Sequence, residues 1–175
     1  MRALLSALLA AVLLATPALA QPTTGLAETA LAPAGPTVSV TLSPALRAAA
    51  QKTYGLPEVE ALAEHLRMSV EKDLERMGVM AGGRVELVLV DAKPSRPTRE
   101  QMRSKPGLSF RSVSLGGAAI EGQMIAFDGA TLPVSFQWYA SDLADSRRQA
   151  VWGDAHWTFE RFSHRLSRGQ LYALR

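Results

Sequence analysis

The stretch Arg111–Tyr139, RSVSLGGAAIEGQMIAFDGATLPVSFQWY, decides the fold because it has the pattern of a long β-hairpin. Apolar residues alternate with small or polar ones along both arms, and the turn dipeptide Asp128-Gly129 separates the arms. The returning arm places its large apolar side chains on one face: Leu132, Val134, Phe136 and Trp138. We expect the rest of the chain to cover this face.

The register of the hairpin is predicted from the requirement that the apolar faces of its two arms coincide. A three-residue loop, Asp128 to Ala130, meets that requirement. The resulting pairs are Ala126 with Leu132, Met124 with Val134, Gly122 with Phe136 and Ile120 with Trp138. A two-residue loop would bring Glu121 and Gln123 onto the apolar face, so we expect the longer loop.

Gly116-Gly117 interrupts the first arm of the hairpin. The apolar positions before these glycines are Val113 and Leu115, whereas those after them are Ile120 and Met124, so the inward-facing parity changes. One extra residue in a strand has this effect, which predicts a β-bulge at the glycines.

The chain before the hairpin predicts a strand, two helices and a second strand. Apolar and polar residues alternate over Val38 to Leu42. A short helix is expected between Ser43 as its N-cap and Gly55, and a long one from Pro57 to Gly78. The apolar run Val85 to Val90 predicts a central strand. This order favours a right-handed crossover that pairs the two strands in parallel.

A closing helix is expected from Asp154, a favourable N-cap, to Gly169. Its buried stripe is predicted to be Trp152, Ala155, Phe159, Phe162 and Leu166. Phe159 and Phe162 should cover the hairpin face that carries Phe136 and Trp138. The sequence therefore predicts a single two-layer α+β domain over residues 37–175, with a mixed sheet of about four strands and two or three packed helices.

The first twenty residues have the pattern of a cleavable signal peptide. Arg2 provides the positive charge, Ala3 to Ala15 the apolar run, and Ala18-Leu19-Ala20 the small-residue cleavage site, so cleavage is predicted after Ala20. Residues 21–36 read as a disordered leader. The chain has no cysteine, which excludes lipidation at a cysteine, disulfides and thiolate zinc sites. We therefore predict an exported, periplasmic protein without a transmembrane segment in its mature chain.

Several short segments carry a resemblance. They are Asp91 to Thr98, Pro106 to Ser109, Gly116 to Ala118, Trp152 to Ala155 and Phe159 to Phe162. Together they resemble a group of uncharacterised exported proteins and lipoproteins of Gram-negative bacteria, which carry domains of unknown function. The resemblance covers about residues 85–169. It implies an envelope location and a small α+β domain, and it supplies no catalytic residues.

The segment from Asp91 to Arg111 is the most basic part of the chain and is a candidate anion-binding site. Its candidate contacts are Arg96, Arg99, Arg103 and Arg111. These arginines could receive a phosphate, a lipid head group or an acidic partner. The alternative interpretation is that they are paired with carboxylates or solvated.

Trp157, Arg161 and Arg168 form a second candidate site, because they fall on the outer side of the closing helix. A large aromatic at such a position either packs under the connection from Ser141 to Val151 or contributes to a partner surface. His156, Glu160 and His164 follow one another at intervals of four residues and could in principle hold a metal. Solvent exposure explains this spacing better, so no metal site is predicted.

The leading functional interpretation is a non-enzymatic protein of the cell envelope that binds a macromolecular partner, such as another envelope protein, or supports an assembly. Neither a catalytic motif nor a cofactor motif is found. The formal net charge of +3, or +2 without Arg2, is too small to imply nucleic acid. The alternative is a hydrolase or a module that binds a small anionic ligand, with its site near residues 91–111.

Overall fold

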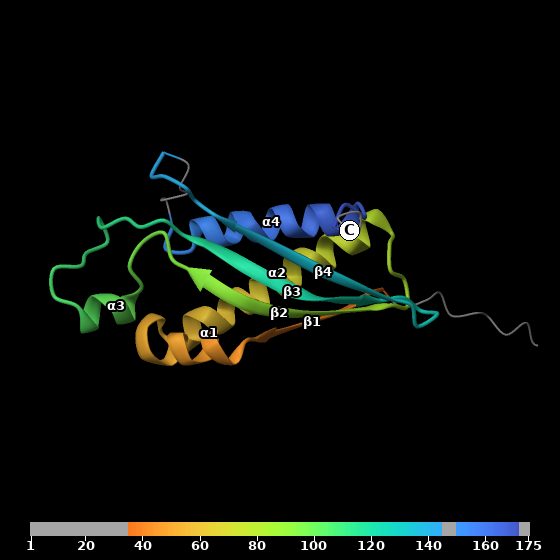
Figure 1. Cartoon of the computed structure of the whole chain (residues 1–175), viewed down its shortest axis with the longest axis horizontal. Coiled ribbons are helices and arrows are strands. Elements are labelled where there is room, and N and C mark those ends of the chain that lie inside the picture. The colour runs from red at the N-terminus through yellow and green to blue at the C-terminus, as the bar shows by residue number, and fades with distance from the viewer. Residues whose placement is uncertain (1–34, 145–149, 172–175) are drawn as a thin grey trace, which may run out of the picture. The chain divides into compact units, whose positions relative to one another are not determined.

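The structure is a computed structural model that describes residues 35–144 and 150–171. These residues form a single α+β domain in which one four-stranded mixed sheet is packed against helices (Figure 1). The predicted fold class is confirmed. The predicted signal peptide and most of the predicted leader lie outside the described residues.

The four strands lie side by side in the order of the sequence. They are β1 (Thr37–Leu42), β2 (Arg84–Lys93), β3 (Gly117–Ile125) and β4 (Thr131–Tyr139). β1 pairs with β2 in parallel, and the other two pairings are antiparallel. The predicted parallel pairing and the predicted central position of β2 are therefore confirmed.

The described helices have capping signals of the sequence at several of their ends. They are α1 (Pro44–Ala49) with a following π-helical turn η1 (Ala50–Tyr54), α2 (Leu56–Met77), α3 (Arg99–Ser104) and α4 (Gly153–Ser167). Ser43 caps α1 by accepting a hydrogen bond from the Leu46 N–H at 3.1 Å. Gly78 ends α2 in the left-handed conformation. None of the described helices is long and apolar enough to cross a membrane.

The hydrophobic core lies between the sheet and the pair α2 and α4. All five residues of the stripe predicted for the closing helix are buried. The rings of Phe136 on β4 and Phe162 on α4 have centroids 6.2 Å apart, as expected for a hairpin covered by this helix. Polar side chains of the sheet, such as Thr41, Glu121 and Ser135, lie on its other face.

The hairpin keeps the predicted apolar face but has a different register. Met124 pairs with Leu132 and Ile120 with Phe136, so β4 is displaced by two residues from the predicted pairing. The loop has the predicted three residues, but they are Phe127 to Gly129. Gly129 has a φ of 85°, and a glycine at the third loop position suits a type I turn followed by a bulge. This geometry leaves Phe127 85% exposed at the tip.

The β-bulge lies in β2 and not at Gly116-Gly117. The pairing between β2 and β3 shifts between Leu89 and Asp91. The strand β3 begins only at Gly117, and residues 111–116 form no strand, which explains why Val113 and Leu115 are exposed. The parity change in the sequence therefore marks the beginning of a strand.

Candidate functional site: an arginine and aromatic surface on α4 and β4

A buried polar cluster fixes the beginning of α4. The carboxylate of Asp154 accepts hydrogen bonds from the Ser95 hydroxyl at 2.8 Å and from the Gly116 N–H at 3.0 Å. The predicted N-cap role of Asp154 is wrong, because the N-cap is Trp152 and Asp154 belongs to the first turn. Its side chain instead connects α4 to the segments before β3. No periodic pattern in the sequence predicts this cluster, because its members are distant in the chain.

Two glycines, Gly116 and Gly117, allow neighbouring segments to approach the backbone closely. A Cβ atom at Gly116 would lie 2.6 Å from the Ser95 hydroxyl oxygen and 2.8 Å from a carboxylate oxygen of Asp154. A Cβ atom at Gly117, where φ is 150°, would lie 2.3 Å from the carbonyl oxygen of Trp138. The glycines thus bring the start of α4 and the end of β4 together.

Trp157 lies against β4 as a result. Its ring centroid is 4.2 Å from that of Trp138. The Arg161 guanidinium carbon lies 4.4 Å from the Trp157 ring centroid, and that of Arg165 lies 5.4 Å from the Phe136 ring centroid. All of these side chains are half-buried. We call this set the arginine–aromatic surface: Phe136, Trp138, Trp157, Arg161 and Arg165.

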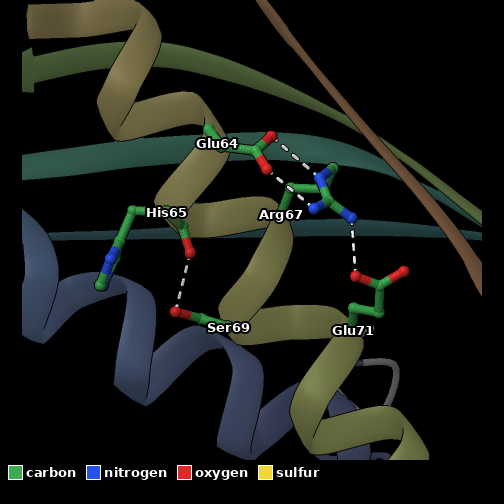
Figure 2. Close-up of polar contacts among 5 residues, drawn as sticks. All are labelled: Glu64, His65, Arg67, Ser69 and Glu71. Atoms are coloured by element: carbon green, nitrogen blue, oxygen red, sulfur yellow. Dashed lines mark hydrogen bonds and ion pairs between the residues drawn. The ribbon is translucent and has the colours of Figure 1, made fainter.

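Among the residues that the structure describes, the two arginines of this surface have no ion-pair partner. Neither Arg161 nor Arg165 forms an ion pair with any described residue. Arg67 on α2 differs, because it donates to Glu64 and Glu71 at once (Figure 2), with ion-pair distances of 2.8 and 2.6 Å. These hydrogen bonds, to Glu64 first and then to Glu71, raise the pKa of Arg67 above its ordinary value.

The strand beside these arginines has a free edge. β4 is the last strand of the sheet, and no described strand pairs with its outer side. The Ala126 N–H donates to the Ala130 carbonyl and the Ala140 N–H to the Gly116 carbonyl, at 2.9 and 3.0 Å. Antiparallel hydrogen bonds alternate along a strand, so the N–H and C=O groups of residues 135, 137 and 139 point away from β3. Pro133, at an equivalent position, offers no N–H.

The second predicted site is thus only partly assembled. Trp157 and Arg161 meet, whereas Arg168 is exposed at the C-cap of α4. Sequence reasoning missed Phe136, Trp138 and Arg165 as parts of a surface, because it placed the two aromatics in the core. The spacing of Trp157, Arg161 and Arg165 at intervals of four residues was a usable signal for one helix side.

The connector arginines do not share one site in the described contacts. Arg96 donates to the Phe110 carbonyl, Arg103 pairs with Glu100 at 3.4 Å, and Arg99 and Arg111 are exposed. The anion site predicted at these four residues stays a prediction.

Asp91, which begins the connector, accepts a hydrogen bond from the Tyr139 hydroxyl at 2.7 Å and lies 4.0 Å from the Lys93 ammonium. Burial and this hydrogen bond raise the pKa of Tyr139 above its ordinary value. The tyrosine is therefore a neutral donor at physiological pH. Asp91 therefore has both a hydrogen-bond donor and a cation as partners.

His156 is not solvent-exposed, contrary to the prediction. It is half-buried between α2 and α4, and its ring stacks on that of His65 with centroids 4.3 Å apart. Burial, and then the neighbouring His65, lower the pKa of His156. Glu160 and His164 are exposed as expected. Over residues 35–144 and 150–171, no three histidine or carboxylate side chains gather in a way that could hold a metal ion.

A groove of about 500 Å³ lies between α2 and α4. Charged groups of both signs line it, among them Asp73, Glu160 and Arg161, so Arg161 shares this groove with two carboxylates although it forms no ion pair with either. The Ser163 hydroxyl donates to Asp73 at 2.8 Å, which ties the two helices together at this groove. The mixed charges give the groove no preference for one class of ligand.

No protein-family model and no curated protein sequence matches the chain. The resemblance to exported Gram-negative proteins therefore stays a prediction from the quoted motifs.

Proposed function

We propose that this chain is a non-enzymatic, exported protein of the cell envelope that acts by binding a macromolecular partner or supporting an assembly through the arginine–aromatic surface. One observation carries the proposal. Two tryptophans and two arginines gather half-exposed at one border of the domain, and no described carboxylate pairs with either arginine. Tryptophan and arginine dominate the binding energy of protein interfaces.

The packing of these side chains on one another lowers the conformational entropy that is lost on binding. A free arginine side chain loses much rotamer freedom when a partner immobilises it. Arg161 already rests on Trp157, and Trp157 rests on Trp138. The side chains are thus held in place before a partner arrives, which favours binding. The predicted signal peptide supports an envelope location for that partner.

Site-specific photo-crosslinking in intact producing cells tests the proposal. A photoreactive residue replaces Gln137, whose exposed side chain lies at the free edge of β4 on the face opposite Phe136 and Trp138, so it reports on a partner at this edge without replacing a residue of the surface. The same residue at Met68, which is exposed on α2, is the matched control. We expect a discrete adduct from position 137 that is absent from position 68 and is lost when Trp157→Ala is added. Identical adducts at both positions, or an adduct that Trp157→Ala leaves unchanged, would contradict the proposal.

A further inference from the structure

We infer that the partner presents an extended acidic peptide segment, which adds a strand to the free edge of β4 and places its carboxylates on Arg161 and Arg165. This inference rests on the proposed function and specifies its ligand. It joins two features that lie side by side: a sheet edge with which no described strand pairs, and two guanidinium groups that form no ion pair with a described carboxylate.

The backbone of β4 provides the pairing groups. Ser135, Gln137 and Tyr139 direct their N–H and C=O groups outward, by the alternation that the bonds at residues 126 and 140 establish. An incoming extended segment can exchange main-chain hydrogen bonds with these groups, as in other cases of strand addition. Such bonds provide affinity without requiring a particular side chain, so the side chains around the edge determine which segments bind.

The charge around this edge favours carboxylates. The Arg165 guanidinium stands over the Phe136 ring and therefore over β4 itself. An added strand would lie about 4.8 Å farther out. Every second side chain of that strand would point to the helix side of the sheet, toward Arg161 and Arg165. Glutamate or aspartate at alternate positions would meet both guanidinium groups, and charge-assisted hydrogen bonds would follow.

A second copy of this chain fits the edge less well. Two β4 edges paired antiparallel would bring both copies of α4 to the same side of the joined sheet. Arg161 and Arg165 of each copy would then face the same residues of the other, and like charges would repel. The edge at β1 offers no comparable attraction for an acidic segment, because its neighbours Arg47 and Arg67 pair with Glu60, Glu64 and Glu71.

Fluorescence anisotropy with a defined peptide tests the inference. The probe is a fluorescein-labelled peptide TEVETEV, which has glutamate at alternate positions. TKVKTKV controls for charge, and TEVETEV with N-methyl groups on alternate residues controls for backbone pairing. We expect the full chain to bind only the first peptide, with affinity that falls as salt is raised. Hydrogen exchange at residues 135, 137 and 139 should slow in the complex.

Variants separate the two features of the site. Gln137→Pro removes one outward N–H and leaves the bonds to β3 intact, so affinity should fall about tenfold. Gln137→Thr keeps the N–H and should bind normally. Arg161→Ala and Arg165→Ala should each cost about fivefold. The exposed Arg103→Ala on α3 is the charge control and should have no effect.

Several results would overturn the inference. The first is equal binding of the N-methylated or lysine peptide, and the second is loss of binding in Arg103→Ala instead of Arg161→Ala. The third is binding to phosphatidylglycerol vesicles with no binding to TEVETEV. The fourth is a dimer in sedimentation that Gln137→Pro converts to a monomer. If TEVETEV fails while the crosslink at position 137 persists, the acidic-strand inference is wrong and the proposed function stands. If the crosslink is also absent, both fail.

Discussion

Two neighbouring helices, α2 and α4, surround their arginines with different groups. On α2, Arg67 lies between Glu64 and Glu71, three residues before it and four after it (Figure 2). On α4, Arg161 and Arg165 lie on aromatic rings and have no described carboxylate partner. The first arrangement satisfies its charge inside one helix, and the second leaves its charge available to another molecule.

The difference shows that the attraction of an arginine for a ligand depends more on the position of nearby carboxylates than on the number of arginines in a segment. The connector was the most basic segment of the sequence, yet Arg96 and Arg103 use local partners there. A solvated ion pair contributes little to stability, but it lowers the attraction that a charge has for a ligand. The arginines of α4 lie on aromatic rings instead of carboxylates, and they retain that attraction.

The largest expected effect comes from detaching α4. Asp154→Ala should lower the free energy of unfolding by about 3 kcal/mol, because it leaves the buried donors of Ser95 and Gly116 without their acceptor. Urea denaturation measures the change, and the exposed Glu121→Ala should stay within about 0.5 kcal/mol of the parent. A loss for Asp154→Ala no larger than that of Glu121→Ala would show that the cluster does not hold the helix.

The difference between the two helices should disappear when Arg161 is given a carboxylate partner on its own helix. Arg165→Glu places a carboxylate four residues after Arg161, the spacing that Glu71 has to Arg67. We expect TEVETEV to bind about thirtyfold more weakly, because one charge is reversed and a second is neutralised. Arg165→Gln, which only removes a charge, should cost about fivefold. Equal losses for the two variants would show that pairing of Arg161 is irrelevant.

The contact between the two helices should depend on pH. His156 has a lowered pKa in the folded state, so between that value and the unfolded value near 6.5 the unfolded chain binds more protons. Stability is therefore full above the unfolded pKa and falls as pH decreases through the folded one. Thermal unfolding from pH 7.5 to pH 5 measures this.

His156→Gln should remove part of this loss of stability in acid. His164→Gln, at an exposed position of the same helix, should leave the loss unchanged. Stability that is as sensitive to acid in His156→Gln as in the parent would assign the effect to other groups.

The smallest expected effect is a difference in salt dependence between an arginine paired with carboxylates and one that lies on an aromatic ring. Arg67→Ala should lower the melting temperature slightly at low ionic strength, and the difference should vanish in about 1 M NaCl, where exposed ion pairs are screened. Arg161→Ala should show less salt dependence, because it loses contact with a ring instead of a carboxylate. A salt response of the same size in both variants would remove the distinction drawn here.

Most of the architecture could be predicted because it depends on local patterns. Period-two alternation, capping residues and the apolar spacing of the closing helix identify the elements and their buried faces. The register of the hairpin could not be predicted in the same way. A displacement by two residues keeps Phe136 on the same face, so hydrophobic patterning cannot detect it. The preference of Gly129 for the third loop position determines the register instead.

Of the candidate site, only residues on the outer side of α4 could be predicted from the sequence. Trp157 and Arg161 follow from helical periodicity, whereas Trp138 and Phe136 join them because β4 is an edge strand. Strand order is a property of the whole sheet, and no single segment encodes it. The hydrogen bond from the Gly116 N–H to the Asp154 carboxylate joins residues 38 positions apart, so it too cannot be predicted from a single segment.

Pro133 limits how much of β4 a second chain can use. Pairing that begins beyond it extends only from Ser135 to Tyr139, roughly 17 Å of extended backbone. So short a stretch offers few main-chain bonds, and complexes that rest on few bonds dissociate quickly. A partner that adds a strand here, as proposed, would therefore exchange rapidly and would depend on several simultaneous contacts for any lasting attachment.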